Sequence, residues 1–279
     1  MTGVLYGVGV GPGDPELMTL KAVRLIRETE MIALPGSAAR ETVAYQIAVQ
    51  AVPELAQKTL LPVSMPMVMN REEMKRNHRK AADLLESRLI QGQNVVYLTL
   101  GDSTIYSTFL YIQRYITERG YRTELVNGVP SFCAAAARTG ISLAEWNEPL
   151  HILPAAHHVR SEAPAPQHPA PMHAPDTAHH LPDNPPVPQH PAPMYAPDTA
   201  HHVRKPFDLP GNYILMKSGH RMDEVKTLLR ESGLDVVMVE NCGMPEEKIY
   251  HGADEIPDDA GYYSLIIAKK PQSEEPDSF

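Results

Sequence analysis

The chain has 279 residues and a formal net charge of −9, and 43% of its residues are apolar. This length predicts about two domains of roughly 150 residues each. No apolar run approaches the roughly 18–20 residues that span a bilayer. A net acidic chain without a basic run is a poor nucleic-acid binder, because phosphate neutralisation needs clustered Lys and Arg. The composition therefore predicts a protein that binds neither membranes nor nucleic acid.

The two cysteines, Cys133 and Cys242, stand far apart in the sequence. This spacing excludes a disulfide scaffold and a Cys-x-x-Cys zinc site, and it suits a reducing cytoplasm. The first residues, MTGVLYGVGVGPGD, lack the basic segment and the cleavage pattern of an export signal. We therefore expect a cytoplasmic protein.

A tandem repeat occupies the middle of the chain. The segment PQHPAPMHAPDTAHH at 166–180 recurs at 188–202 with one substitution. Residues 159–202 hold 12 of the 27 prolines and too few large apolar side chains to offset the entropy of ordering. We interpret these 44 residues as a duplication inserted into a loop of a 235-residue enzyme. Nine of the thirteen histidines lie at 157–202, so a loose metal-binding loop is the alternative interpretation, whereas a catalytic metal site is not expected there.

Outside the repeat, apolar runs typical of buried strands alternate with stretches of helical periodicity. In chain order, the sequence predicts a strand at 4–10, a helix at 19–30, a strand at 30–36, a helix at 72–92, a strand at 94–100, a helix at 107–120, a strand at 122–126, a helix at 131–140, strands at 150–154 and 212–216, a helix at 220–232, and strands at 235–239 and 262–270. In the helix at 107–120, Phe109, Ile112 and Ile116 share one face. The alternation favours α/β sheets with helices on both faces.

The first motif is the glycine-rich turn GVGVGPGD at 7–14, which follows a predicted buried strand. Glycines let backbone amides approach a ligand closely. The dinucleotide pattern G-x-G-x-x-G fails, because its last glycine falls on Pro12 or on Asp14, depending on the frame. The P-loop pattern fails as well, since no Gly-Lys-Ser/Thr follows. The turn therefore either holds some other ligand or merely joins strand to helix.

Two further turns follow predicted strands. In LTLGDSTIYST at 98–108, Asp102 stands at the carboxyl end of a strand, where open α/β sheets bind ligands, and Tyr106 is four residues away. A lone acid at that place is as often a helix cap as a catalyst. The third turn is VNGVPSFCAAAA at 126–137, which leads into a helix of small residues. Three such turns without a phosphate-binding lysine favour a ligand held by backbone groups in a cleft.

Five segments in sequence order carry a family resemblance: GVGVGPGDPELMTLKA, YLTLGDSTIYST, VNGVPSFCAAAA, NYILMKSG and VENCGMPEEKIY. They resemble the tetrapyrrole methyltransferases that use S-adenosylmethionine, most closely the branch that methylates carbon 20 of precorrin-2 or cobalt-factor II in cobalamin biosynthesis. The resemblance implies two α/β/α domains with the active-site cleft between them, S-adenosylhomocysteine as the product of the cofactor, and a homodimer. We expect the domains at 1–125 and 126–270, with the insert at 159–202 and a polar tail at 271–279.

The resemblance also assigns site residues. The implied cofactor contacts are Pro12, Leu100, Gly101, Asp102, Ile105, Tyr106, Ser131, Phe132, Met216, Asn241 and Cys242. Our candidates for the base that removes a proton from the methylated carbon are Asp102 and Tyr106, with solvent or the substrate's own nitrogens as the alternative. No metal ligand is expected. The chain departs from the common Gly-Asp-Pro pattern of the family, because Ser103 follows Asp102.

Two alternatives stay open at this point. The same fold could methylate another tetrapyrrole carbon, or an RNA or protein target, although the acidic charge opposes RNA. The second alternative is a metal-binding or cobalt-delivery protein whose histidine-rich repeat is its functional part.

Overall fold

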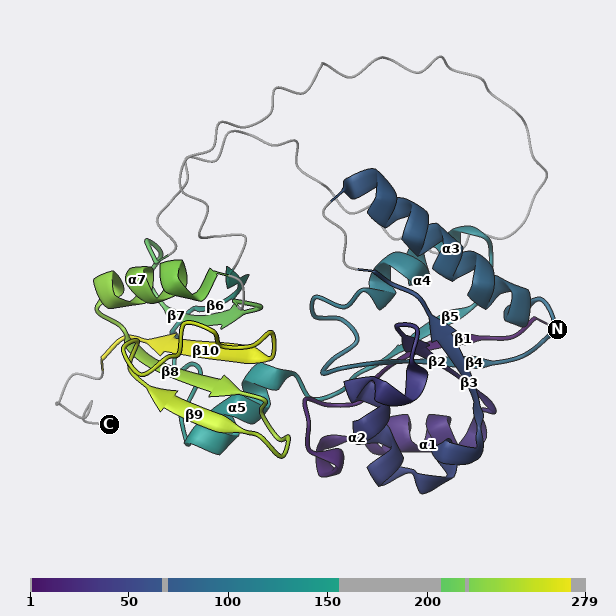
Figure 1. The fold of residues 1–279 in the computed structure, drawn as a ribbon, viewed down its shortest axis with the longest axis horizontal. Helices are drawn as coiled ribbons and strands as arrows, with labels where there is room; N and C mark the ends of the chain where they lie inside the picture. The colour runs from purple at the N-terminus through teal and green to yellow at the C-terminus, as the bar shows by residue number, and fades with distance from the viewer. Residues whose placement is uncertain (1, 67–69, 156–206, 219–220, 272–279) are drawn as a thin grey trace, which may run out of the picture.

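The computed structural model describes residues 2–66, 70–155, 207–218 and 221–271. The predictions for the repeat at 159–202, for the histidines at 157–158 and for nearly all of the tail lie outside the described residues. The described chain forms two five-stranded sheets, each with helices packed against it, and they occupy separate parts of the molecule (Figure 1). The predicted α/β fold class with two α/β/α units is therefore confirmed.

The first sheet is parallel throughout, with the strand order β3-β2-β4-β1-β5. Gly7 of β1 faces Tyr97 of β4 in the register. Because all strands run the same way, the loops that follow β1, β4 and β5 leave the same edge of the sheet. The strands are β1 (Leu5–Gly9), β2 (Met31–Pro35), β3 (Thr59–Val63), β4 (Val95–Thr99) and β5 (Thr123–Val126).

Helices cover both faces of this sheet, as a buried parallel sheet requires. The helices α1 (Leu20–Glu28) and α2 (Val43–Ala51) pack on one face. The helices α3 (Arg71–Leu89) and α4 (Phe109–Glu118) pack on the other (Figure 1). The predicted inward face of α4 is confirmed, since its buried side chains are Phe109, Ile112 and Ile116. Short 3₁₀ helices lie at η1 (Pro15–Leu17), η2 (Ala39–Glu41) and η3 (Pro53–Gln57).

The second sheet has the order β6-β7-β10-β8-β9 and is mixed. Only β6 and β7 are parallel, while β10 runs antiparallel to β7 and β8, and β9 runs antiparallel to β8. The helix α5 (Ser131–Thr139) packs on one face and α7 (Met222–Ser232) on the other. The strands are β6 (Leu150–Pro154), β7 (Asn212–Met216), β8 (Asp235–Glu240), β9 (Lys248–His251) and β10 (Ser264–Lys269).

Three elements escape the sequence patterns. The helix α2 is apolar almost all round, so it shows no amphipathic period. The strand β3 contains Pro62, which weakens its strand signal but is tolerated because β3 is an edge strand. The strand β9 has four residues, three of them exposed, and carries too few apolar side chains to stand out.

Candidate functional site

Three glycine-containing loops meet at the carboxyl edge of the first sheet. The amide of Gly101 donates to the carbonyl of Gly11 at 2.8 Å, and the amide of Gly11 donates back to Gly101 at 3.2 Å. A Cβ atom on Gly9 would lie 2.5 Å from the carbonyl oxygen of Gly101, and one on Gly128 would lie 2.1 Å from the same oxygen. No side chain fits between these backbones, so the loops after β1, β4 and β5 touch only because they carry glycine.

The buried carboxylate of Asp102 joins two of these loops. One oxygen accepts hydrogen bonds from the amide (2.7 Å) and the hydroxyl of Thr104. The other accepts from the side-chain amide of Asn127 and from the backbone amide of Gly128, each at 3.1 Å. Burial by itself would raise the pKa of Asp102, but these four hydrogen bonds outweigh it and hold the pKa below its usual value. Asp102 is therefore an ionised anchor between the loops after β4 and β5.

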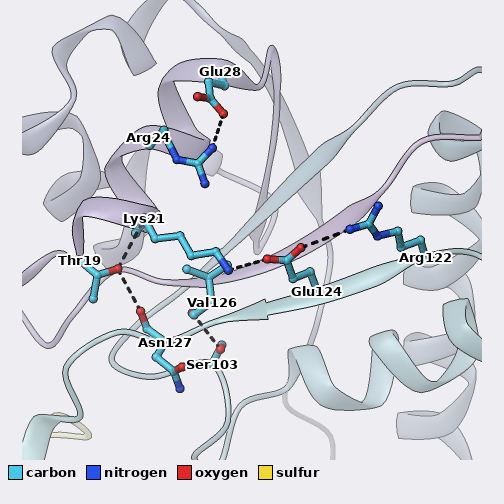
Figure 2. Close-up of polar contacts among 10 residues, drawn as sticks. Thr19, Lys21, Arg24, Glu28, Ser103, Arg122, Glu124, Val126 and Asn127 are labelled. Carbon is cyan, nitrogen blue, oxygen red and sulfur yellow. Dashed lines mark hydrogen bonds and ion pairs between the residues drawn. The ribbon is translucent and has the colours of Figure 1, made fainter. Parts of the chain in front are cut away.

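Ser103, which stands where the family commonly has proline, connects the same two loops by a second hydrogen bond. Its fully buried hydroxyl donates to the carbonyl of Val126 at 3.0 Å, at the end of β5 (Figure 2). The hydroxyl of Thr19, the N-cap of α1, donates to the neighbouring carbonyl of Asn127 at 3.2 Å (Figure 2). The turn after β4 is thus held by a side-chain hydrogen bond where the family commonly has proline.

The loop after β1 also packs directly against the loop that follows β8 of the second sheet. A Cβ atom on Gly13 would lie 2.3 Å from the carbonyl oxygen of Cys242, in the loop after β8. Gly243 has a φ of +74°, and a Cβ atom there would lie 2.7 Å from the amide nitrogen of Asp14. The amide of Gly243 donates to Glu247 at 2.6 Å, which fixes this loop in place. The loop after β1 and the loop after β8 therefore meet backbone against backbone at these glycines.

Tyr106 makes a second connection between the two parts. Its hydroxyl donates to the carbonyl of Ile152 in β6 at 2.8 Å. The ammonium group of Lys217, which follows β7, donates to the carbonyl of Tyr106 at 3.2 Å and lies 5.8 Å from the centre of its ring. Partial burial raises the pKa of the Tyr106 hydroxyl, so it stays protonated at neutral pH.

Backbone strain gathers in the same region. Among the described residues, four that are not glycine have a positive φ, and three of them are Tyr106 (48°), Lys217 (58°) and Asn241 (54°). A left-handed conformation is costly for such residues and is retained where the surrounding structure enforces it, often at functional sites. The three stand in the loops after β4, β7 and β8, which are the segments that the sequence assigned to the site.

Four of the predicted cofactor contacts lie in one apolar cluster. Phe132 and Cys242 are buried in it, and Ile105 and Met216 pack against it, although they come from four separate segments. Burial, reinforced by Glu247, raises the pKa of the Cys242 thiol to about 11. Ile105 and Met216 are the partly exposed members of the four, and apolar side chains of this kind suit the uncharged part of a ligand.

The other predicted contacts lie around this cluster with different exposures. Pro12 and Gly101 are buried, and a Cβ atom on Gly101 would meet only open space. Leu100 packs instead toward the α1 and α2 side of the first sheet. Ser131 begins α5 and is partly buried. The side chain of Asn241 donates to the carbonyl of Glu246 at 3.4 Å.

Sequence reasoning quoted the segments that contain Lys217, Gly13 and Gly243 but did not name these three residues as parts of the site. Gly13 carried a signal, because it belongs to the glycine-rich first turn, but its partner across the molecule was not visible in the sequence. The described residues, those of the site included, contain no group of three His, Cys, Asp or Glu side chains able to hold a metal ion. None of the helices in the described ranges is long and apolar enough to cross a membrane.

Comparisons with known proteins identify the family and the fold of the chain. The family model for Tetrapyrrole (Corrin/Porphyrin) Methylases matches residues 4–255. A probable cobalt-precorrin-2 C(20)-methyltransferase of Methanocaldococcus jannaschii is 38% identical over 151 residues, which cover 54% of this chain and 63% of the relative. This match spans less than two thirds of the relative's length.

Two further similarities extend over nearly the whole chain. The cobalt-precorrin-2 C(20)-methyltransferase of Salmonella typhimurium is 25% identical over 275 residues, which cover 97% of this chain and 98% of the relative. The crystal structure of a uroporphyrin-III C-methyl transferase from Thermus thermophilus, complexed with S-adenosyl homocysteine, has a TM-score of 0.59 at 19% identity. It covers 96% of this chain and 97% of that one, and it shows the shared fold.

Proposed function

The chain belongs to the tetrapyrrole methylase family, as the sequence predicts, and from this membership we propose that it transfers a methyl group from S-adenosylmethionine to carbon 20 of precorrin-2 or cobalt-factor II. The observation that carries the proposal is the match of the family model to residues 4–255. Two of the relatives are named for reaction at this carbon. Those names do not favour the alternative of a metal-delivery protein.

The residues present fit S-adenosylmethionine as the methyl donor. When bound, this cofactor supplies an electrophilic methyl group on a sulfonium sulfur. The partly exposed apolar side chains of Ile105 and Met216 suit its uncharged parts, and the space beside Gly101, where a Cβ atom would meet nothing within 4 Å, leaves room for a ligand. We propose that Pro12, Leu100, Asp102, Tyr106, Ser131, Asn241 and Cys242 complete the binding site.

We propose that the chain accelerates methyl transfer by alignment and by exclusion of water. Correct alignment alone is worth effective molarities on the order of 10⁵ M or more. The closely packed backbones of Gly101 and Gly128 form one side of the site. The left-handed backbones of Tyr106 and Asn241 hold their loops in defined conformations.

The contacts of the two candidate bases favour positioning over proton transfer. The carboxylate of Asp102 already accepts four hydrogen bonds and has a lowered pKa, which makes it a weak base. The hydroxyl of Tyr106 donates to Ile152 and has a raised pKa, so it carries its proton at neutral pH. We propose that Asp102 holds the loops together and that Tyr106 closes one side of the site, while solvent or the substrate takes the proton.

Three further properties belong to the same proposal. We propose a cytoplasmic homodimer, with domains at 1–125 and 126–270. The family resemblance supports the dimer, and the two separate sheets support the division. Light scattering of the purified protein should then give about twice the 30.9 kDa of one chain.

Titration calorimetry and an activity assay test the function. We expect S-adenosylhomocysteine to bind the purified protein, and we expect S-adenosylmethionine to support methylation of precorrin-2 or cobalt-factor II. Isotope-labelled methyl groups and NMR of the product would locate the new methyl group at carbon 20. Absence of S-adenosylhomocysteine binding at millimolar concentration, or methylation at another carbon, would overturn the proposal.

A further inference from the structure

Lys217 follows β7 directly, next to the predicted cofactor contact Met216. We propose that its ammonium group binds a carboxylate of the ligand, as a residue that sets ligand affinity and orientation. This inference rests on the proposed function, because both S-adenosylmethionine and the tetrapyrrole carry carboxylates.

The position of Lys217 is fixed by its surroundings. Its backbone is left-handed (φ 58°), which a lysine adopts at a cost. Its ammonium group reaches across to Tyr106, where it donates to the backbone carbonyl at 3.2 Å and lies 5.8 Å from the ring centre. A long, flexible side chain is thus held at the place where the loop after β4 meets the second sheet.

The charge of Lys217 is not neutralised by any ion pair among the residues that the structure describes. By contrast, Lys226 and Lys269, which belong to the same part of the molecule, pair with Asp258 and Glu145 at 2.6 Å and 3.2 Å. An ammonium group has three donors, and the neutral carbonyl of Tyr106 satisfies one of them.

The negative net charge of the protein bears on the role of the unpaired charge of Lys217. A chain with a net charge of −9 repels anionic ligands at long range, so an anion site needs a local cation. A hydrogen bond between an ammonium group and a carboxylate is among the stronger ones in proteins. Lys217 stands beside Met216 and Tyr106, two predicted site residues, and is therefore placed to supply that cation.

The carboxylate has two sources, the methionine part of the cofactor and the acidic side chains of the tetrapyrrole. Two probes separate them. S-adenosylhomocysteine carries the amino acid carboxylate, whereas methylthioadenosine has the same adenosine and thioether without it. Cobalt-factor II reports on the tetrapyrrole.

The experiment compares the full-length wild type with Lys217→Gln, Lys217→Arg and Lys80→Gln. Lys80 is an exposed lysine of α3 and serves as the matched control. Calorimetry gives the Kd for S-adenosylhomocysteine and for methylthioadenosine, and kinetics give KM and kcat for cobalt-factor II. Thermal unfolding of each variant monitors the fold.

If the cofactor is the source of the carboxylate, Lys217→Gln raises the Kd for S-adenosylhomocysteine about tenfold and leaves the Kd for methylthioadenosine unchanged. If the tetrapyrrole is the source, the variant instead raises KM for cobalt-factor II about tenfold with little change in kcat. In both cases Lys217→Arg restores most of the loss, and the loss shrinks as salt is added.

Two results overturn the proposal. One is a change of less than about twofold in both Kd values and in KM. The other is an equal rise in the Kd for S-adenosylhomocysteine and for methylthioadenosine, because that result assigns Lys217 a structural role beside Tyr106. Failure of the proposed function is distinguished from both by the wild type, which then binds no S-adenosylhomocysteine at all.

Discussion

The carboxylate of Asp102 accepts a hydrogen bond from the backbone amide of Gly128 at 3.1 Å, which joins the end of β4 to the loop after β5. The two residues are 26 positions apart in the chain, and the bond lies in a buried place. Gly128 can lie this close to the loop after β4 because it has no Cβ atom, which would meet the carbonyl oxygen of Gly101. The edge of the sheet that is expected to bind ligand is therefore cross-linked by a buried hydrogen bond.

We expect Asp102→Asn to lower the free energy of unfolding by about 2 kcal/mol at pH 7, because one acceptor oxygen becomes a donor and leaves buried donors unpaired. The folded-state pKa of Asp102 lies below the unfolded value of about 3.9. Its contribution is thus complete above the unfolded pKa and is lost as pH falls through the folded pKa. Urea unfolding should show a constant difference between wild type and variant from neutral pH to about pH 5, and a shrinking one below about pH 4. A difference that stays constant at acid pH would contradict this expectation.

Replacing Ser103 by alanine removes the donor to Val126 and leaves that carbonyl without its side-chain partner. We expect a loss of about 1 kcal/mol in unfolding free energy, measured by urea denaturation. Ser87→Ala is the control, because Ser87 is an α3 residue whose hydroxyl bonds only to the nearby carbonyl of Leu84. Its effect should stay within about 0.5 kcal/mol. Equal effects at the two serines would remove the case for Ser103 as a tie between loops.

Gly13→Ala should separate the two parts of the molecule, since the new methyl group would lie 2.3 Å from the backbone oxygen of Cys242. We expect a loss of about 2 kcal/mol or more in stability and at least about a tenfold weaker binding of S-adenosylhomocysteine. Gly233→Ala is the control, because a Cβ atom there meets nothing within 4 Å, although its φ is +66°. That variant should cost about 1 kcal/mol and leave ligand binding intact. Unchanged binding in Gly13→Ala would show that the contact between the loops does not shape the site.

Tyr106→Phe distinguishes positioning from proton transfer. The change removes the hydrogen bond to Ile152 but keeps the ring under Lys217. We expect kcat to fall by less than about tenfold, whereas loss of a general base costs about a hundredfold or more. Single-turnover rates with cobalt-factor II measure the chemical step. A drop of the larger size, with a pH profile that loses its rise in rate toward alkaline pH, would restore Tyr106 as the base.

The two cysteines should differ in reactivity. Cys242 is 5% exposed, and its thiol pKa is raised to about 11, so little thiolate exists at neutral pH. Cys133 is exposed on the first turn of α5, although partial burial of its thiol also raises its pKa. We expect iodoacetamide to modify Cys133 much faster than Cys242 at pH 7.5, as mass spectrometry of the peptides would show. Faster labelling of Cys242 would mean that the loop after β8 opens in solution.

Much of the fold follows from local patterns. The strands at 4–10 and 94–100 and the helix at 107–120 appear as β1, β4 and α4, because buried parallel strands and one-sided helices leave clear periodicity. The helix α2 and the strand β9 leave none, since one is apolar all round and the other is largely exposed. The local patterns also could not predict that the second sheet mixes parallel and antiparallel strands, because strand direction depends on how each connection crosses the sheet.

The sequence by itself determined the family and pointed to the segments that we expect to form the site, because five glycine-, acid- and methionine-containing motifs keep their order along the chain. Only the tertiary structure decided what each residue touches. It gave Asp102 four hydrogen-bond donors, gave Ser103 a partner in Val126, and brought Lys217 to Tyr106 across 111 positions of the chain. The reason is physical: residue type and spacing set which chemistry is available, whereas pKa values and contacts depend on neighbours that are distant in sequence.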